Sequence, residues 1–252
     1  MLRSRGGSAA VSFGGARNNE LATTCQDESK LRTAYRDVVE RYDPSFIDFD
    51  LEGADLLDTA GGERRAKAVA ALQGDRNASG NKLAVWLTLP ASPRGLTDAG
   101  IAAVEQMLQA GVQLSGVNLM TMNYGASRDI SQSMLDAAKS AAGAAHDQLS
   151  ILYQRAGTNL SREQVWKKLG LTPMIGRNDL PGEVFGLDAA KGLKDYALEL
   201  GIQRLSMWSL NRDAPCASGA QAQNASFVCS GVDQDSIRFS DLLGSGLPGR
   251  MG

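Results

Sequence analysis

Acidic residues occupy every second position in one short apolar run of the chain, FIDFDLEG at 46–53. Alternate side chains of a strand point to opposite faces, so Asp48, Asp50 and Glu52 would share one face and the apolar residues the other. A helix would scatter the three acids around its circumference, and Phe and Ile favour strands. The run therefore predicts a strand that carries three carboxyl groups on one face.

Three like charges so close together on a half-buried surface repel one another and are costly to desolvate, so we expect at least one carboxyl group to hold a proton near neutral pH. A carboxylic acid that stays protonated is what general acid catalysis requires. The same pattern also occurs on solvated strand faces and in Mg²⁺ ligand pairs. Strands with apolar residues facing outward and polar residues inward suit a barrel wrapped by helices, in which catalytic groups project from the C-terminal strand ends.

The rest of the chain predicts an alternation of strands and helices. Strands are expected at 8–13, 46–52, 83–89, 117–122, 172–175 and 204–210, and helices at 28–42, 63–72, 97–111, 127–152, 161–169, 187–200 and 235–243. This order is typical of a parallel sheet built from βαβ units, either open or closed into a barrel. No G-x-G-x-x-G follows a strand, which argues against a dinucleotide-binding sheet.

Length and charge limit the class of protein further. A chain of 252 residues is enough for one α/β barrel domain. The 26 basic and 28 acidic residues nearly cancel and do not cluster by sign, so no nucleic acid and no anionic membrane surface is expected as a partner. No apolar stretch is long enough to span a bilayer, and residues 1–7 lack the apolar core of a signal peptide. An uncharged partner is the expectation.

Four separated motifs, in order, resemble those of the family 18 glycoside hydrolases, or chitinases, particularly their bacterial and archaeal branch. The motifs are SFGG at 12–15, DFDLE at 48–52, MNY at 122–124 and MWS at 207–209. The resemblance implies a TIM-type (β/α)8 barrel. The chain opens at what resembles the third strand of that barrel, so we expect residues 1–252 to form a single catalytic domain with six recognisable strands, N-terminally truncated by two βα units. The strands at 8–13 and 204–210 would then have open edges, which invite self-association.

The resemblance also implies a role for each motif residue. Glu52 would protonate the glycosidic oxygen, while the acetamido carbonyl of the sugar attacks the anomeric carbon. Asp50 would hold the acetamido N–H, and Asp48 would share a proton with Asp50, as a coupled titration. Tyr124 would donate a hydrogen bond to the acetamido oxygen, and Trp208 would form the floor under the sugar. The implied substrate-binding positions also include Gly14, Gly15 and Met122.

The implied activity is hydrolysis of β-1,4 bonds between N-acetylglucosamine units with retention, on chitin or chito-oligosaccharides, with no cofactor and no metal. Secretion is implied as well. A non-catalytic chitin-binding protein is the alternative, and the presence of Glu52 favours the enzyme. A phosphotransferase with Mg²⁺ on Asp48 and Asp50 is a third hypothesis, but the chain lacks a phosphate-binding glycine loop followed by Lys.

Two positions depart from the family pattern. Ser45 stands where the first acid of the catalytic motif would fall, and Asn123 stands where many relatives have an acid beside the tyrosine. Four further residues could line the cleft or be structural: Trp86, Trp166, Asp179 and Asp213. The single histidine, His146, is interpreted as a surface or packing residue and not a ligand.

Three cysteines leave one unpaired. Cys216 and Cys229 bracket a loop rich in Ala, Ser, Gln and Asn, which a disulfide would usefully close. We therefore predict a bond between these two residues in oxidising conditions, and a free thiol at Cys25.

Overall fold

One mostly parallel sheet forms the centre of the computed structural model, which describes residues 4, 7–217 and 225–244. Its parallel strands lie in the order β1-β2-β3-β5-β6-β9. Their bounds are Val11–Gly14, Phe46–Asp50, Ala84–Ser92, Leu114–Met120, Leu169–Thr172 and Arg204–Leu205. Strand β4 (Gly95–Leu96) turns back antiparallel onto β3, and β7 (Gly176–Arg177) pairs with β8 (Val184–Phe185) in a separate hairpin.

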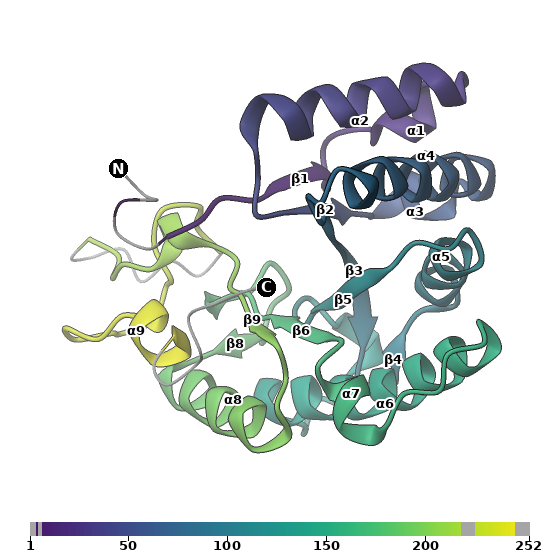
Figure 1. The fold of residues 1–252 in the computed structure, drawn as a ribbon. Coiled ribbons are helices and arrows are strands. Elements are labelled where there is room, and N and C mark those ends of the chain that lie inside the picture. The colour runs from purple at the N-terminus through teal and green to yellow at the C-terminus, as the bar shows by residue number, and fades with distance from the viewer. Residues whose placement is uncertain (1–3, 5–6, 218–224, 245–252) are drawn as a thin grey trace.

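Helices follow the strands in sequence and lie along the outer side of the sheet (Figure 1). The helices are α1 (Leu21–Thr24), α2 (Glu28–Tyr42), α3 (Gly53–Leu57), α4 (Thr59–Ala78), α5 (Asp98–Gln109), α6 (Met134–Arg155), α7 (Arg162–Trp166), α8 (Leu187–Leu200) and α9 (Phe239–Gly244). Because a helix connects each parallel strand to the next, the C-terminal ends of all the parallel strands lie on the same side of the sheet. The alternating parallel architecture confirms the expected fold class.

Local sequence signals set the helix ends. The side chains of Asp27, Thr97 and Ser133 each accept a hydrogen bond from the backbone N–H three residues later, at the start of α2, α5 and α6. Helix α8 ends at Gly201, whose φ of 73° is the left-handed conformation common at helix C-termini.

The two faces of β2 differ as the alternation predicts. Ile47, Phe49 and Leu51 are fully buried toward the helices, where the Phe49 ring lies 5.3 Å from that of Phe13 and 5.4 Å from that of Tyr35. The acids at 48 and 50 point to the opposite, interior face of the sheet. The prediction of apolar residues outward and polar residues inward is therefore confirmed.

Several predicted boundaries were wrong. The helix predicted at 161–169 ends at Trp166, so Leu169 is the first residue of strand β6. The strand predicted at 204–210 is regular only over Arg204–Leu205, and Trp208 retains a single bridge to Met174. The helix predicted from 127 begins at Met134, because Ser133 caps it.

Strands β1 and β9 stand at the two ends of the strand order. In the described part of the chain, neither strand has a second neighbour in the sheet. Self-association through these edges stays a prediction.

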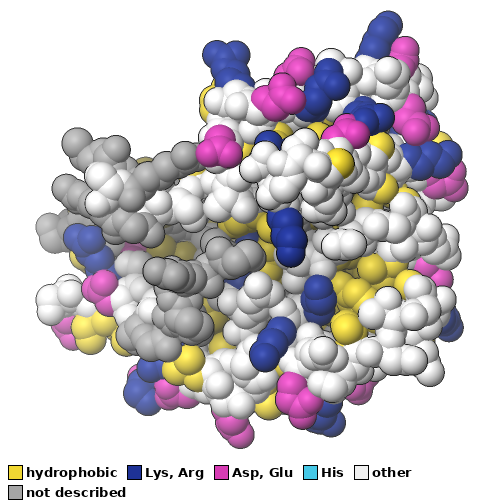
Figure 2. All heavy atoms as spheres, viewed as in Figure 1, with side chains coloured by type: hydrophobic (Ala, Val, Ile, Leu, Met, Phe, Trp, Pro, Cys, Tyr) yellow, Lys and Arg dark blue, Asp and Glu magenta, His cyan; other side chains and the backbone are white. Residues whose placement is uncertain are grey.

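The face shown in Figure 2 has basic and acidic side chains interspersed around its periphery, without a large patch of one sign. Within residues 7–217 and 225–244, no helix is both long enough and apolar enough to cross a bilayer.

Candidate active site

Asp48 lies at the interior face of β2 and both of its carboxylate oxygens are bound. The Ser12 hydroxyl donates to Oδ2 at 2.7 Å and the Thr88 hydroxyl donates to Oδ1 at 2.9 Å. These partners come from the strands on either side, β1 and β3. Asp48 is almost fully buried, so burial raises the pKa of this carboxyl group, although both hydroxyl donors act in the opposite direction.

The polar contacts continue across two further strands. Asn118 on β5 donates to the Thr88 hydroxyl at 3.2 Å and accepts from the Thr172 hydroxyl of β6 at 2.9 Å. Sequence reasoning missed these residues. Each is a polar residue between two apolar neighbours in the sequence, and that pattern is the signal that could have found them.

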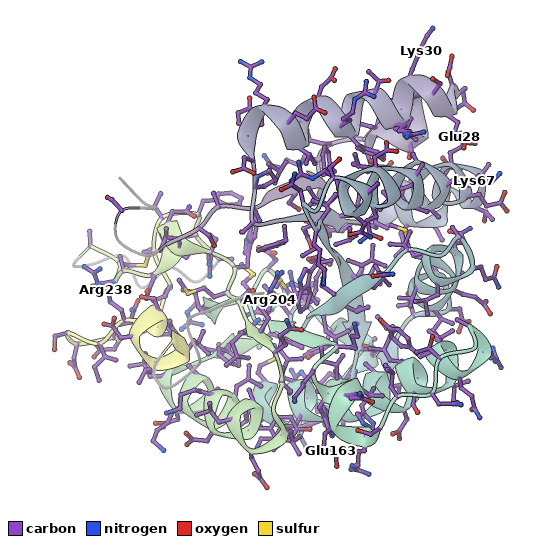
Figure 3. All side chains as sticks on the ribbon, viewed as in Figure 1. Glu28, Lys30, Lys67, Glu163, Arg204 and Arg238 are labelled. Atoms are coloured by element: carbon purple, nitrogen blue, oxygen red, sulfur yellow. A yellow bond between two sulfur atoms is a disulfide. The ribbon has the colours of Figure 1, made fainter. Side chains whose placement is uncertain are left out.

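A buried cation lies near Asp48 in the sheet interior. The Arg204 guanidinium is 3.8 Å from the centre of the Trp86 ring and 4.1 Å from that of Phe46. Burial lowers the pKa of Arg204 to about 10, and the charge of Arg204 in turn lowers the pKa of Asp48. Figure 3 shows Arg204 at the middle of the molecule, whereas the labelled residues Lys30 and Glu163 lie at its periphery.

Trp86 is a structural residue. It is 1% exposed, and its ring occupies space that side chains at Gly116 and Gly170 would fill. A β-carbon on Gly116 would lie 2.4 Å from the ring, and one on Gly170 would lie 3.2 Å from it. This tryptophan packs with Arg204 in the interior and does not line an open cleft.

Asp50, the last residue of β2, has a strongly perturbed carboxyl group. Its Oδ1 is buried and accepts no hydrogen bond from the residues that the structure describes. Burial, together with the negative charges of Glu52 and Asp48, raises the pKa of Asp50 to about 7. A carboxyl group with that pKa holds a proton in part of the population near neutral pH, as the spacing of the three acids predicts.

Glu52 lies just beyond the strand. The backbone stays extended after Asp50, with Leu51 N–H donating to the Thr88 carbonyl oxygen at 3.1 Å, and Glu52 is the N-cap residue of α3. The carboxyl group of Glu52 is half-buried, which raises its pKa, while a hydrogen bond from the Ala16 backbone N–H acts against that shift. A raised pKa suits a proton donor.

The turn at Gly14 and Gly15 brings the backbone of β1 against this acid. Both glycines have positive φ, 96° and 94°, and the Gly15 N–H donates to the Asp50 carbonyl oxygen at 2.8 Å. A β-carbon on Gly15 would meet the Asp50 carboxylate at 3.5 Å. These contacts explain the two glycines structurally, and their predicted contact with substrate stays a prediction.

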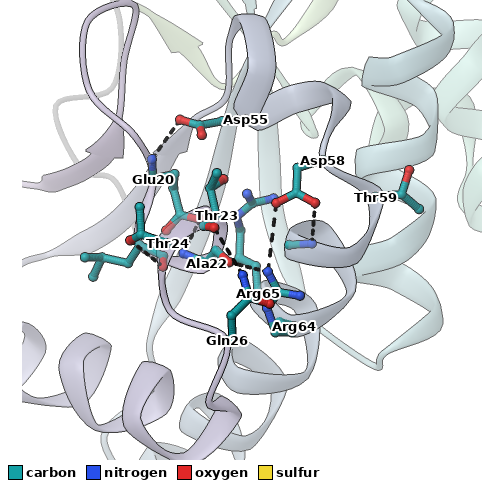
Figure 4. Close-up of polar contacts among 12 residues, drawn as sticks. Glu20, Ala22, Thr23, Thr24, Gln26, Asp55, Asp58, Thr59, Arg64 and Arg65 are labelled. Atoms are coloured by element: carbon teal, nitrogen blue, oxygen red, sulfur yellow. Dashed lines mark hydrogen bonds and ion pairs between the residues drawn. The ribbon is translucent and has the colours of Figure 1, made fainter.

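A buried polar network joins Glu20, Arg65 and Asp55 (Figure 4). The Glu20 carboxylate accepts from Arg65 Nε at 2.8 Å and from the Ala22 N–H at 3.0 Å, and the Glu20 N–H donates to Asp55 Oδ2 at 2.7 Å. Asp55 belongs to α3, the helix that Glu52 caps. The network therefore ties the segment after Gly15 to the helix after Glu52.

Tyr124 and Met122 follow the C-terminal end of β5 and are 5% and 8% exposed. The Tyr124 hydroxyl is buried and makes no hydrogen bond of good geometry with any described residue, although the nearby Thr121 side chain acts to lower the pKa of Tyr124. Burial and the nearby Glu183 carboxylate both raise the pKa of Tyr124 above its ordinary value. The hydroxyl thus stays protonated and keeps a free donor.

Trp208 is the exposed tryptophan of the three. Half of it is accessible, and its backbone is fixed by two hydrogen bonds, from its N–H to the Pro173 carbonyl oxygen at 2.9 Å and from the Ile175 N–H to its own carbonyl oxygen at 3.0 Å. A flat aromatic ring held in this way is a surface on which a sugar can stack.

Other residues that could have lined the cleft are structural. Trp166 stacks on His146 at 4.3 Å, in the helical layer, which confirms the packing interpretation of the histidine. Asp213 accepts from the backbone N–H groups of Phe239 and Ser240 at 2.8 and 3.0 Å and so holds the start of α9. Asp179 is exposed and is bonded to Asn123.

The cysteines pair as predicted. Cys216 and Cys229 form a disulfide with their Cα atoms 5.0 Å apart, and Cys25 is free. Among residues 7–217 and 225–244, no three His, Cys, Asp or Glu side chains are grouped so that they could hold a metal ion.

Comparison with known proteins identifies the family to which this chain belongs. A scan against protein-family models finds no match. The chain is 36% identical over 220 residues to a probable bifunctional chitinase/lysozyme of Escherichia coli and 36% identical over 222 residues to endochitinase 11 of Metarhizium anisopliae. These matches cover 85% and 86% of this chain but only 24% and 42% of the two relatives, so the chain spans less than half of their length.

A solved structure matches over most of its own length. The catalytic domain of a hyperthermophilic chitinase from Pyrococcus furiosus superposes with a TM-score of 0.82 at 30% identity, over 96% of this chain and 73% of that one. The parallel α/β fold of this chain is thus the fold of a chitinase catalytic domain. The chain belongs to the family 18 glycoside hydrolases, the chitinase family.

Proposed function

We propose that this protein is a chitinase that cleaves β-1,4 bonds between N-acetylglucosamine units with retention, by substrate-assisted catalysis. The observation that carries the proposal is the pair Asp50 and Glu52, in which Asp50 has a pKa of about 7 and Glu52 a raised pKa. The names of the relatives support the substrate class, since site mutants of the Pyrococcus furiosus domain were solved with chito-oligosaccharides.

In the first step the Glu52 carboxyl group gives its proton to the glycosidic oxygen. The bond from C1 to that oxygen breaks, and the acetamido carbonyl oxygen of the same sugar bonds to C1 to give an oxazolinium ion. The Asp50 carboxylate accepts the acetamido N–H and offsets the positive charge that develops on the ring. The Asp50 carboxylate is available for this contact because the hydroxyl groups of Ser12 and Thr88 donate to Asp48 and not to Asp50.

In the second step water attacks C1 while Glu52, now a carboxylate, takes a proton from that water. The bond from C1 to the acetamido oxygen breaks, which restores the acetamido group and leaves the product hydroxyl in the β configuration. Two inversions at C1 give net retention.

The remaining site residues hold the sugar. The free donor of the buried Tyr124 hydroxyl suits the acetamido oxygen, and the exposed Trp208 ring suits the apolar face of the sugar. Burial and the negative charges of Glu52 and Asp48 raise the pKa of Asp50, and the two aspartates titrate as a coupled pair that shares a proton.

Hydrolysis of a chito-tetrasaccharide, followed by NMR of the fresh product, tests the proposal. We expect the β anomer first, and no cleavage of cellotetraose, which lacks the acetamido nucleophile. The α anomer, or equal cleavage of both tetramers, would contradict substrate assistance. Binding of the chito-tetrasaccharide without cleavage would instead favour the non-catalytic chitin-binding alternative.

We also infer that the chain works in an oxidising compartment, as expected for a secreted protein. The bond between Cys216 and Cys229 supports this, since disulfides persist mainly outside the reducing cytosol. Thiol labelling of the protein from its native source tests the inference: one reactive thiol per chain is expected, and three would overturn it.

A further inference from the structure

Three consecutive backbone N–H groups at the end of β5 are bound by side chains from one later segment. The Asn123 N–H donates to Asn178 Oδ1 at 3.2 Å. The N–H groups of Tyr124 and Gly125 donate to the two carboxylate oxygens of Glu183, at 3.0 Å to Oε2 and 2.8 Å to Oε1. One carboxylate therefore accepts hydrogen bonds from the two backbone N–H groups that flank the Tyr124 side chain.

The backbone conformation explains why an anion fits there. Asn123 and Gly125 have left-handed φ of 51° and 52°, while Tyr124 between them is right-handed, with φ −71° and ψ −29°. Residues of alternating hand turn successive N–H groups toward one concavity, which is a common way for a backbone to bind a negative group. Asn and Gly are the residues that tolerate left-handed φ most readily.

We propose that Glu183 is a positioning residue that fixes the turn at Asn123–Gly125 and thereby aims the Tyr124 hydroxyl at the acetamido group of the bound sugar. This inference rests on the proposed function, in which Tyr124 donates to that group. Glu183 itself is 2% exposed and would not touch the sugar. Its effect on catalysis would pass entirely through Tyr124.

The segment that carries Glu183 is itself well anchored. Glu183 directly precedes β8, and its own N–H donates to the Leu180 carbonyl oxygen at 3.2 Å. The Asn178 amide donates to the Met174 carbonyl oxygen at 2.8 Å, next to the bridge between Met174 and Trp208. The Glu183 carboxylate therefore connects Tyr124 to the segment after β6, in which Met174 pairs with Trp208.

A second pair of hydrogen bonds joins the same turn to the later segment, through Asn123, the residue that departs from the family pattern. Its amide donates to Asp179 Oδ2 at 2.9 Å, and its Oδ1 accepts the Asp179 N–H at 3.0 Å. An acid at position 123 could not donate to Asp179. The reciprocal pair of bonds thus needs an amide at this position, which gives Asn123 a structural role.

Arg128 balances the charge of Glu183 without replacing its contacts. The distance from Arg128 Nε to Glu183 Oε1 is 3.8 Å, an ion pair, and the Arg128 side chain is 9% exposed. In a Glu183→Gln variant the side chain keeps its size, but one acceptor oxygen becomes an NH₂ group that faces a backbone N–H. One of the two bonds to the turn would be lost, and the other would lose its charge assistance.

A double-mutant cycle with Glu183→Gln and Tyr124→Phe tests the proposal, with chito-tetrasaccharide as substrate. We expect Glu183→Gln to lower kcat about tenfold with KM nearly unchanged, because a misplaced donor is felt mainly in the transition state. In the Tyr124→Phe background, adding Glu183→Gln should lower kcat no further. The control Glu199→Gln, on an exposed residue of α8, should match the parent protein.

Equal loss of kcat from Glu183→Gln with and without the Tyr124 hydroxyl would overturn the proposal, as would a Glu183→Gln protein with full activity. Hydrogen exchange at the Tyr124 and Gly125 amides gives a readout that does not depend on turnover. We expect both amides to exchange about tenfold faster in the variant. Unchanged exchange would show that Glu183 does not fix the turn at Asn123–Gly125. This result would hold even if the parent protein cleaved no chitin, so it is distinguishable from a failure of the proposed function.

If Glu183→Gln does not fold, Glu183→Asp serves in its place, because it keeps the charge and reaches one N–H. The shorter side chain should raise the exchange rate at only one of the two amides. Protection of both amides at the parent level in Glu183→Asp would contradict the proposal.

Discussion

A β-carbon on Gly14 would lie 2.2 Å from the carbonyl oxygen of Asp50. The end of β1 approaches the end of β2 this closely because the residue has no side chain, and its φ of 96° is a conformation that other residues rarely adopt. The close approach lets the Gly15 N–H reach the Asp50 carbonyl oxygen at 2.8 Å. It also leads the chain to Ala16, whose N–H donates to the Glu52 carboxylate.

Gly14→Ala should therefore destabilise the fold and reduce turnover together. We expect a loss of about 3 kcal/mol or more in the free energy of unfolding, from backbone strain plus the clash. Gly80→Ala is a matched control, because Gly80 also has positive φ but a β-carbon there would meet nothing within 4 Å. That control should lose about 1 kcal/mol. Urea unfolding of both variants compares them, and equal losses would show that the clash is relieved.

The raised pKa of Asp50 makes stability depend on pH. The folded protein binds a proton at Asp50 up to about pH 7, whereas the unfolded chain releases it near the ordinary value of 3.8. Between these two values the folded state holds more protons, so stability falls as the pH rises. Because Asp50 is partly exposed, we expect Asp50→Asn to gain only about 1–2 kcal/mol over the parent at pH 8, and almost nothing at pH 3.5.

Thermal or denaturant unfolding of the parent and of Asp50→Asn across this pH range provides the measurement. Asp37→Asn, on an exposed position of α2, should run parallel to the parent. A difference between the parent and Asp50→Asn that stays constant with pH would contradict the assigned pKa.

Asp48 should set the acid limit of activity. Its negative charge raises the pKa of Asp50, so Asp48→Asn removes part of that shift and lets Asp50 lose its proton at lower pH. Because the Asp50 carboxylate is the form that accepts the acetamido N–H, we expect the acid limb of kcat/KM to move toward lower pH in this variant. The pH profile of chito-oligosaccharide hydrolysis measures the limb, and a shift toward higher pH would show that Asp48 acts by another route.

The disulfide should contribute to stability but not to chemistry. Closing a loop of 13 residues is worth about 3 kcal/mol in the chain-entropy account, so replacing Cys216 and Cys229 together by Ser should cost about that amount. Cys25→Ser is the control and should cost less than about 1 kcal/mol, because this thiol is unpaired and only partly buried. Equal losses in the two proteins would show that the bond does not constrain the unfolded chain.

The alternation of acids in 46–53 was enough to predict a strand, its buried face and a perturbed carboxyl group. Helix ends with a clear cap, such as α2 at Asp27, were also predictable, because the cap is a local interaction. The resemblance of the four motifs then indicated the family.

What the sequence could not predict depends on contacts between distant residues. Trp86 and Trp208 are both tryptophans in predicted strands. Trp86 is buried against the Arg204 guanidinium, whereas Trp208 is half exposed. Only the packing of Arg204 and the small residues opposite Trp86 separates the two cases. The contact of Glu183 with Tyr124 spans 59 positions and has no local pattern in either segment.

The most direct test of the account replaces Glu52 by Gln, which removes the transferable proton but hardly changes the shape of the side chain. We expect chito-tetrasaccharide hydrolysis to fall by about a thousandfold or more, while calorimetry shows nearly unchanged binding of the tetrasaccharide. Glu63→Gln, at an exposed position of α4, should retain the parent rate. A Glu52→Gln protein that hydrolyses the tetrasaccharide at the rate of the parent would contradict the assignment of Glu52 as the proton donor.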